Sequence, residues 1–167
     1  MKALEPPDSH FLSAAQGWME LGCHREANEE LARIRPERAR HPDVLQVRWH
    51  IQAKAKQWET CLEIGKTMVQ VEPNEPYGWI NRANALFYLK RYQEAHDALW
   101  PALERFPENP FVPYNLACYT CQLGRVEEAL VWFQKALDFS DRKQLIEMGL
   151  KDPDLEPIWV QIRTSVV

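Results

Sequence analysis

The sequence predicts an all-α protein built from pairs of short helices that recur along the chain. Apolar residues follow helical spacing within successive stretches, and small residues recur 34 positions apart. Glycine or proline separates many of these stretches, as in tight turns between helices. Together these observations indicate a repeated helical hairpin.

The clearest copy of the hairpin runs from Pro76 to Asn109. Its small and apolar residues have the spacing of two helices that pack face to face, and Pro107 closes it. The residues that define the pattern are Trp79, Ala83, Leu86, Tyr92, Ala95, Leu99 and Ala102.

Small residues mark the same place in four successive stretches. Ala27, Cys61, Ala95 and Ala129 lie 34 residues apart, and small side chains at such a place let two helices approach closely. Two further sets have the same period. They are Phe11, Leu45, Trp79 and Pro113, and Leu31, Gly65, Leu99 and Phe133.

This spacing resembles the tetratricopeptide repeat, a helix-turn-helix unit of 34 residues. The resemblance implies a right-handed superhelical solenoid of antiparallel helix pairs, because one hairpin cannot bury its apolar face alone. We expect an irregular lead over residues 1–7 and a C-terminal capping segment over residues 144–167. Between them we expect four units, over residues 8–41, 42–75, 76–109 and 110–143.

The first unit is expected to pair helices over residues 9–21 and about 25–35 around a turn at Gly22. Asp8 or Ser9 is a candidate N-cap of the first helix, because either side chain can accept hydrogen bonds from its free amides. Prolines bracket the connector that follows, so the second helix should be short or bent.

The second unit is expected to pair helices over residues 43–55 and 59–71. Trp49 occupies a place that alanine holds in the other units, and Gly65 a place that leucine or phenylalanine holds. Either the large side chain fills the space that the glycine leaves, as a swap within the core, or the unit is locally distorted.

The third unit should pair helices over residues 77–90 and 93–106. Pro101 falls inside the second of these helices and should kink it. The fourth unit should pair residues 111–123 with residues 126–138.

After the fourth unit the period stops. Residues 140–149 should form one more helix, and a last short helix should end near Arg163 with Asp154 as its cap. This tail is placed to cover the last apolar surface, as arrays of repeats require. The ending from Leu150 to Trp159 also resembles the segment after the last repeat in bacterial members of the family.

Composition excludes several function classes. The formal net charge of −4 is mild and there is no basic stripe, so the footprint of a nucleic-acid binder is missing. No apolar run approaches the roughly 20 residues needed to cross a bilayer, and the first residues lack the layout of a signal peptide. We therefore expect a cytoplasmic protein without nucleic acid or membrane as a partner.

In tetratricopeptide arrays the first helix of each unit lines the concave side, and the resemblance implies ligand contacts there. Asparagine can bond an extended peptide backbone, and aromatic rings can receive its apolar side chains. We expect this groove to be richest in the third and fourth units, unless the aromatic residues only pack between neighbouring units. The third unit offers Tyr77, Asn81, Asn84 and Tyr88, and the fourth Phe111, Asn115, Cys118 and Gln122. The second offers Asp43, Val47, His50 and Lys54, and the first Ser9, Ser13, Gln16 and Glu20.

One use of the family is a clamp of cationic and asparagine side chains that grips the terminal carboxylate of heat-shock chaperones. Since no cation occupies the matching places, nothing there can pair with a carboxylate, and we exclude this ligand. The matching places hold Leu12, Gln16, Val47, Tyr77 and Asn81.

Cys118 and Cys121 form a Cys-x-x-Cys pair, a pattern found in redox and metal sites. The pair falls in the middle of a helix, no second cysteine pair exists, and a whole unit separates His50 from the pair. We favour two small groove-lining thiols, kept reduced, over metal or redox chemistry, and we expect no cofactor.

No nucleophile elbow, phosphate loop or His-Glu metal motif occurs, so we expect no enzyme activity. Glu127 and Glu128 should lie on a solvated outer surface. The histidines expected near helix ends, in turns or on an exposed helix face are His10, His24, His41 and His96.

The sequence thus favours a non-catalytic module for protein–protein interaction that binds a peptide or partner segment in the concave groove. Two alternatives stay open. One is a chaperone of the type III secretion kind, although these usually have three repeats and dimerise through an N-terminal helix. The other is a scaffold that assembles with itself through apolar edges. The partner is not named by the sequence, and we expect a monomer or weak dimer.

Overall fold

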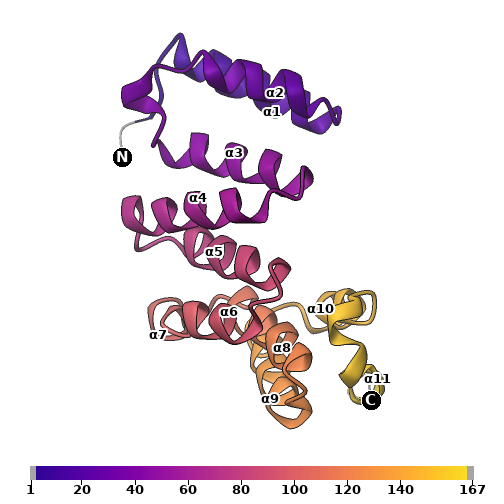
Figure 1. The fold of residues 1–167 in the computed structure, drawn as a ribbon. Coiled ribbons are helices and arrows are strands. Elements are labelled where there is room, and N and C mark those ends of the chain that lie inside the picture. The colour runs from indigo at the N-terminus through magenta and orange to yellow at the C-terminus, as the bar shows by residue number, and fades with distance from the viewer. Residues whose placement is uncertain (1–2, 165–167) are drawn as a thin grey trace. The chain divides into compact units, whose positions relative to one another are not determined.

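The computed structural model describes residues 3–164, and every regular element in that range is a helix (Figure 1). This confirms the all-α prediction. The chain divides into two compact units, one ending at Ala85 and the other starting at Leu86. The expected lead and capping segment include residues 1–2 and 165–167, which lie outside the described residues.

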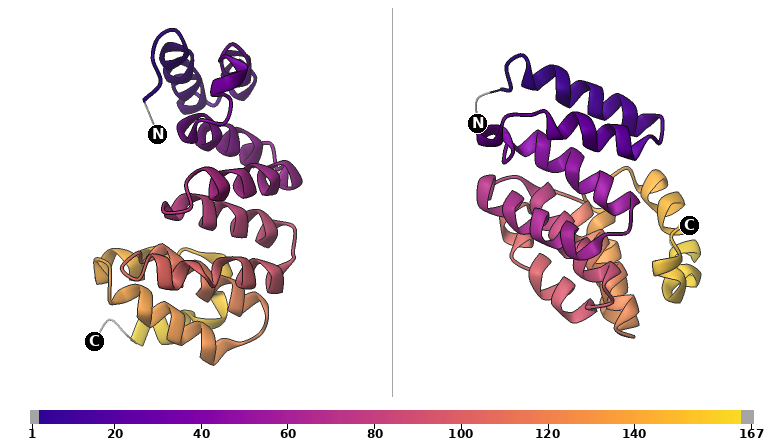
Figure 2. Two further views of the ribbon diagram at one scale, coloured as in Figure 1. Left: turned by 90° about the vertical axis from the view of Figure 1, so that its left-hand side faces the viewer. Right: turned by 45° about the horizontal axis from the view of Figure 1, so that its top comes forward.

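The first unit holds two complete helix pairs. A short turn reverses the chain in each, so the paired helices run antiparallel (Figure 2). The prolines shorten the second helix as expected, because it ends at Ala32 rather than near Arg35. The elements are α1 (Asp8–Glu20), α2 (His24–Ala32), η1 (Pro36–Arg38), α3 (Pro42–Lys54) and α4 (Trp58–Val71), and α5 (Pro76–Tyr88) begins here and continues into the second unit.

The second unit contains the remaining helices. Pro101 interrupts the second helix of the third pair, which stops at Leu99 and resumes at Ala102, and the predicted kink is confirmed. The elements are α6 (Tyr92–Leu99), α7 (Ala102–Arg105), α8 (Phe111–Gln122), α9 (Val126–Leu137), α10 (Arg142–Gly149), η2 (Pro153–Ile158) and α11 (Trp159–Thr164).

The four hairpin turns share one backbone conformation. A residue with positive φ lies in each turn, namely Gly22 (76°), Lys56 (56°), Lys90 (61°) and Gly124 (73°). Glycine adopts this left-handed conformation freely, whereas a residue with a Cβ pays roughly 1–2 kcal/mol for it. The four positions are 34 residues apart, so the backbone repeats even where the side chains do not. The expected helix bounds placed a turn in every unit, but no glycine at Lys56 or Lys90 indicated the positive φ.

The expected column of small residues lies in the core. Ala27, Cys61, Ala95 and Ala129 are all fully buried, which confirms that they permit close helix packing. The core around the first three helices consists of Leu12, Ala15, Ala27, Leu31, Ile34, Val44, Val47 and Ile51. The second unit buries Leu99, Val112, Leu116, Tyr119, Leu155, Ile158 and Ile162 almost completely.

Gly65 packs against the backbone of α5. A Cβ placed on Gly65 would lie 2.7 Å from the Cα of Arg82, closer than side-chain carbons approach in proteins. The neighbouring helix therefore takes the space beside this glycine. The suggestion that Trp49 fills the space beside Gly65 is wrong, because the backbone of α5 occupies that space.

Asp8 is buried, but neither it nor Ser9 caps α1, whose N-cap is Pro7 without a side-chain hydrogen bond. Asp8 instead accepts hydrogen bonds from the backbone N–H of Arg35 at 3.1 Å and from its Nε at 2.8 Å. The guanidinium also forms an ion pair with it at 2.7 Å. The cap prediction is wrong, because this carboxylate ties the start of α1 to the end of the first helix pair. The Arg35 side-chain hydrogen bond is the main reason why the pKa of Asp8 is lowered.

Replacing Gly65 by alanine should destabilise the first unit, because α4 and α5 would have to move apart. We expect a loss of roughly 1–3 kcal/mol, the usual cost of overpacking. Gly17→Ala is the matched control, since a Cβ there meets no atom within 4 Å and the helix should gain roughly 0.5–1 kcal/mol. Urea unfolding followed by circular dichroism measures both. A Gly65→Ala variant as stable as the wild type would contradict the close approach.

The Asp8→Asn variant should have a lower urea midpoint than the wild type at pH 7, because it keeps the shape but loses the charge that Arg35 pairs with. Since folding lowers the pKa of Asp8, the stabilisation is complete above its unfolded value near about 4 and is lost as the pH falls through the folded value. The difference between the two proteins should therefore shrink below pH 4. Arg35→Gln should reproduce the loss at pH 7. Equal midpoints at pH 7 would show that the pair contributes nothing.

Candidate functional site

The first helices of the first two pairs form a cavity. It lies between α1 and α3, opens to solvent and has a volume of about 540 Å³. Most of its lining residues belong to the predicted ligand-contact sets of the first two units, and the exceptions are Met19 and Gln46. The lining residues are Gln16, Met19, Glu20, Asp43, Gln46, Val47 and His50.

This α1/α3 cavity has an apolar floor and an acidic rim. Val47 is buried, whereas Glu20, Asp43 and His50 are exposed. The Nδ1 of His50 donates a hydrogen bond to the carbonyl oxygen of Gln46 at 2.9 Å, because a carbonyl can only accept. The Nε2 of the neutral ring is then left as an acceptor.

The residues predicted on α5 differ in accessibility. Tyr77 and Tyr88 are 56% and 51% exposed and lie on one stripe of the helix, about three turns apart. Asn81 is buried, and its Nδ2 lies 3.8 Å from the sulfur of Met68. Asn84 is half-buried. The two tyrosines are therefore the accessible members of this set.

On α8 the C-terminal segment covers part of the predicted surface. Phe111 is 49% exposed, and the half-buried Asn115 donates to its carbonyl oxygen at 2.6 Å. Cys118 is buried against the segment that follows α10, and Gln122 donates to a carbonyl oxygen of that segment at 3.4 Å. A ligand can reach the ring of Phe111 directly, but the thiol of Cys118 lies beneath the chain itself.

Asp152 ties the C-terminal segment to α8. One of its oxygens accepts hydrogen bonds from the Tyr114 hydroxyl at 2.8 Å and from the Cys118 thiol at 3.7 Å, and the other accepts the N–H of Asp154 at 3.0 Å. Asp152 is therefore the cap of η2, and the prediction of Asp154 as a cap is wrong. Sequence reasoning missed Tyr114 because its partner lies beyond the last repeat, outside the period.

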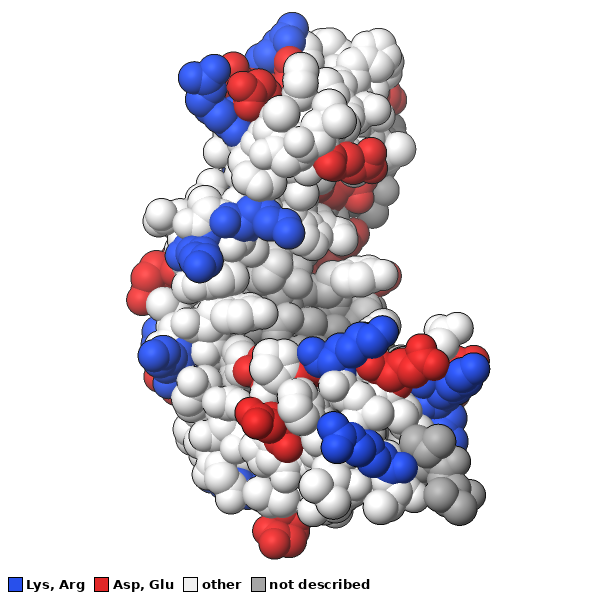
Figure 3. Space-filling view, turned by 90° about the vertical axis from the view of Figure 1, so that its right-hand side faces the viewer, with Lys and Arg blue, Asp and Glu red and all other residues white. Residues whose placement is uncertain are grey.

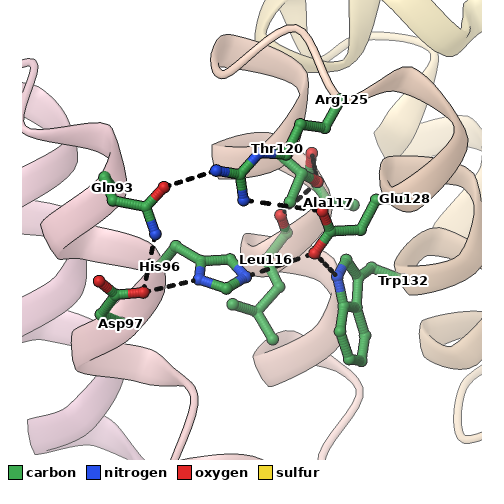
Figure 4. A network of polar contacts seen from close by, with 9 residues as sticks. All are labelled: Gln93, His96, Asp97, Leu116, Ala117, Thr120, Arg125, Glu128 and Trp132. Atoms are coloured by element: carbon green, nitrogen blue, oxygen red, sulfur yellow. Dashed lines mark hydrogen bonds and ion pairs between the residues drawn. The ribbon is translucent and has the colours of Figure 1, made fainter.

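A polar network joins α6 to α9 (Figure 4). The ring of His96 is buried between two carboxylates, with Nδ1 3.1 Å from Asp97 and Nε2 3.5 Å from Glu128. Glu128 also accepts the indole N–H of Trp132 at 3.2 Å. The hydrogen bond to His96 is the largest cause of a lowered pKa at Asp97.

Gln93 and Arg125 extend the network. Gln93 donates to Asp97 at 2.8 Å and accepts from Arg125 at 2.7 Å. The prediction that His96 and Glu128 lie on exposed outer faces is wrong, because these second helices meet one another there. Both ring nitrogens of His96 face carboxylates, which explains this histidine as a structural link between helices.

Burial raises the pKa of three thiols. The pKa values of Cys61 and Cys121 rise to about 11, and that of Cys118 rises well above its ordinary value. The thiolate is the reactive and metal-binding form, so these side chains are poor nucleophiles at neutral pH. Among residues 3–164 no group of three or more His, Cys, Asp or Glu side chains could hold a metal ion. The burial and raised pKa values of Cys118 and Cys121 favour packing over thiol chemistry for the Cys-x-x-Cys pair.

Charged side chains are dispersed over the face in Figure 3. Lys and Arg lie there in separate groups with Asp and Glu among them, and uncharged residues fill the space between. This face therefore carries no continuous basic stripe. None of the described helices is long and apolar enough to cross a bilayer.

Comparisons with known proteins agree with this architecture. Residues 114–142 match the tetratricopeptide repeat family. MamA from Desulfovibrio magneticus superposes with a TM-score of 0.72 at 17% identity, covering 98% of this chain and 95% of that one. A thermophilic tetratricopeptide-repeat protein from Thermus thermophilus gives 0.71 at 18% identity, over 95% and 96% of the two chains. MamA of MSR-1 gives 0.66 at 22% identity, over 80% and 76%. No curated protein matches the sequence.

The chain has a tetratricopeptide-repeat fold. Its matched repeat falls within the predicted fourth unit, which contains α8 and α9. In tetratricopeptide-repeat terms α1, α3, α5 and α8 are the first helices of their pairs. The predicted ligand residues lie on these four helices, as does the α1/α3 cavity.

Thiol accessibility gives a direct check. At pH 8 a chromogenic disulfide reagent should modify Cys23 quickly, because it is the partly exposed cysteine, and the other three only after denaturation. A thiol with a pKa of about 11 is deprotonated in roughly one molecule in a thousand at this pH. Cys23→Ser should remove the fast phase. Fast modification of Cys118 or Cys121 in the folded protein would contradict the packing role.

Proposed function

We propose that the chain is a non-catalytic module for protein–protein interaction, which binds a peptide or partner segment along the first helices of its helix pairs. Solenoids of repeats use such surfaces for binding. The observation that carries the proposal is the α1/α3 cavity. Its lining comes from the helix columns that the repeat register assigns to a ligand, and its volume falls within the roughly 300–1,000 Å³ of small-ligand pockets.

Exposed aromatic rings supply a second argument. Tyr77, Tyr88 and Phe111 each leave about half of their surface in water although their rings are large and apolar. Aromatic side chains of this kind are the usual anchors of protein interfaces. They stand on first helices, where a bound segment would cover them.

The proposed contact set keeps the residues that the repeat register selects, with different roles. The aromatic residues act as anchors, and Asn84, Asn115 and Gln122 bond a partner backbone. Asn81 and Cys118, being buried, act from beneath the surface by packing. The set is Tyr77, Asn81, Asn84, Tyr88, Phe111, Asn115, Cys118 and Gln122. A bacterial and cytoplasmic setting stays a prediction.

Self-assembly is the second candidate, and one observation favours it. An apolar hollow of about 760 Å³ lies between α9 and α11 in the second unit, over Phe133 and Ile162. Its rim includes the exposed side chains of Val131 and Phe139. Another copy of the chain could cover this surface, in which case the first-helix faces would be idle.

The test is affinity capture from a lysate of the source organism. The triple variant Tyr77→Ala, Tyr88→Ala, Phe111→Ala should lose the captured partner, with binding reduced by roughly tenfold or more, because interface anchors of this kind each contribute on the order of 1–2 kcal/mol. Circular dichroism should show that the variant folds like the wild type, since all three rings are exposed.

The matched control replaces Val131 and Phe139 of the α9/α11 hollow and the exposed Val160 of α11, as Val131→Ala, Phe139→Ala, Val160→Ala. It should retain the partner. Loss of the partner with this variant, and retention with the aromatic one, would overturn the proposed binding face and favour the α9/α11 hollow.

A further inference from the structure

The α1/α3 cavity presents hydrogen-bond acceptors and negative charge, and this points to the chemistry of its occupant. The carboxylates of Glu20 and Asp43 stand on its rim, and its lining contains no lysine or arginine. Whenever the His50 ring is uncharged, its Nε2 adds a further acceptor, since Nδ1 donates to Gln46. A group that fits must donate hydrogen bonds and carry positive charge.

Glu20 carries its negative charge at the C-terminal end of α1. It is the last residue of α1, and a negative charge at a helix C-terminus is disfavoured by roughly 0.3–1 kcal/mol. Among residues 3–164 no cation forms an ion pair with it. A ligand cation would relieve this unfavourable position.

Within the part of the chain that the structure describes, no lysine or arginine forms an ion pair with Asp43. The nearest basic group that contacts it is the imidazole of His41, whose Nδ1 lies 3.6 Å from Oδ2 and which is charged only when protonated. Lys54 stands on the same helix one turn beyond His50, but it does not line the cavity. The cavity itself therefore remains acidic.

The floor of the cavity suits the aliphatic part of a long cationic side chain. Val47 and Met19 provide apolar surface below the charged rim. Arginine and lysine bury their methylene stems on such surface while the charged head stays among polar groups. An acidic segment would instead meet two carboxylates and be repelled.

We propose that the α1/α3 cavity binds an arginine or lysine side chain of a partner segment, with the charged head between Glu20 and Asp43 and the stem on Val47. The partner segment is thus basic at this point. This inference rests on the proposed function and names the ligand chemistry of one part of that surface.

The probe is a phage library of short random peptides, selected on the full chain at low salt. Bound peptides should be enriched in arginine and lysine and depleted of aspartate and glutamate. One selected peptide, labelled with fluorescein, is then titrated by anisotropy. Its affinity should fall on the order of tenfold for the Glu20→Gln, Asp43→Asn variant, since two part-exposed ion pairs are lost. It should also weaken as salt is added.

The matched control is Glu59→Gln, Glu127→Gln. It removes the same charge from exposed first-turn positions of α4 and α9. Neither residue lines the cavity, so this variant should bind like the wild type. If both variants lost the same amount of affinity, the loss would come from the change in net charge and the inference would be overturned.

The remaining outcomes separate this inference from the proposed function. Peptides that bind without a preference for basic residues, or that bind the Glu20→Gln, Asp43→Asn variant as well as the wild type, would overturn the cationic site and leave peptide binding intact. A selection that yields no bound peptide would count against both.

Discussion

The reversal of the chain within each helix pair is the constraint on which the rest of the structure depends. One residue of every hairpin turn has a positive φ, at Gly22, Lys56, Lys90 and Gly124. This tight reversal places the paired helices side by side, and the fully buried small residues at each 34th position allow them to pack closely. Two of the turns use lysine, so packing of the helices outweighs a local cost of roughly 1–2 kcal/mol.

Repetition fixes which helices stand first in their pairs, and departures from repetition decide the chemistry of the faces of these helices. The first helices present equivalent faces, but the face between α1 and α3 carries Glu20 and Asp43, whereas α5 carries Tyr77 and Tyr88. These are not residues that the packing requires. A charge at an unfavourable helix end and half-exposed aromatic rings are retained at a cost that binding would offset.

Buried polar groups serve a different purpose. Asp8 of α1 binds Arg35, which follows α2, and His96 of α6 lies between Asp97 of the same helix and Glu128 of α9. Such groups need partners because an unpaired buried polar atom is costly. They stabilise one arrangement of the helices and leave the first-helix faces as the accessible surfaces.

Sequence by itself determined the helix pairs, their period, the break at Pro101 and the small residues of the core. These features follow from local rules. The spacing of apolar residues predicts helices, a proline lacks the N–H that a helix needs, and a small side chain leaves room for a neighbouring helix. Only the tertiary structure decided that Asp8 is a buried ion-pair partner, that Gly65 admits the backbone of Arg82, and that the C-terminal segment covers Cys118. The α1/α3 cavity belongs to the same class, because its lining comes from two helices. Each of these features depends on groups far apart in the chain, and a periodic pattern carries no information about which of them meet.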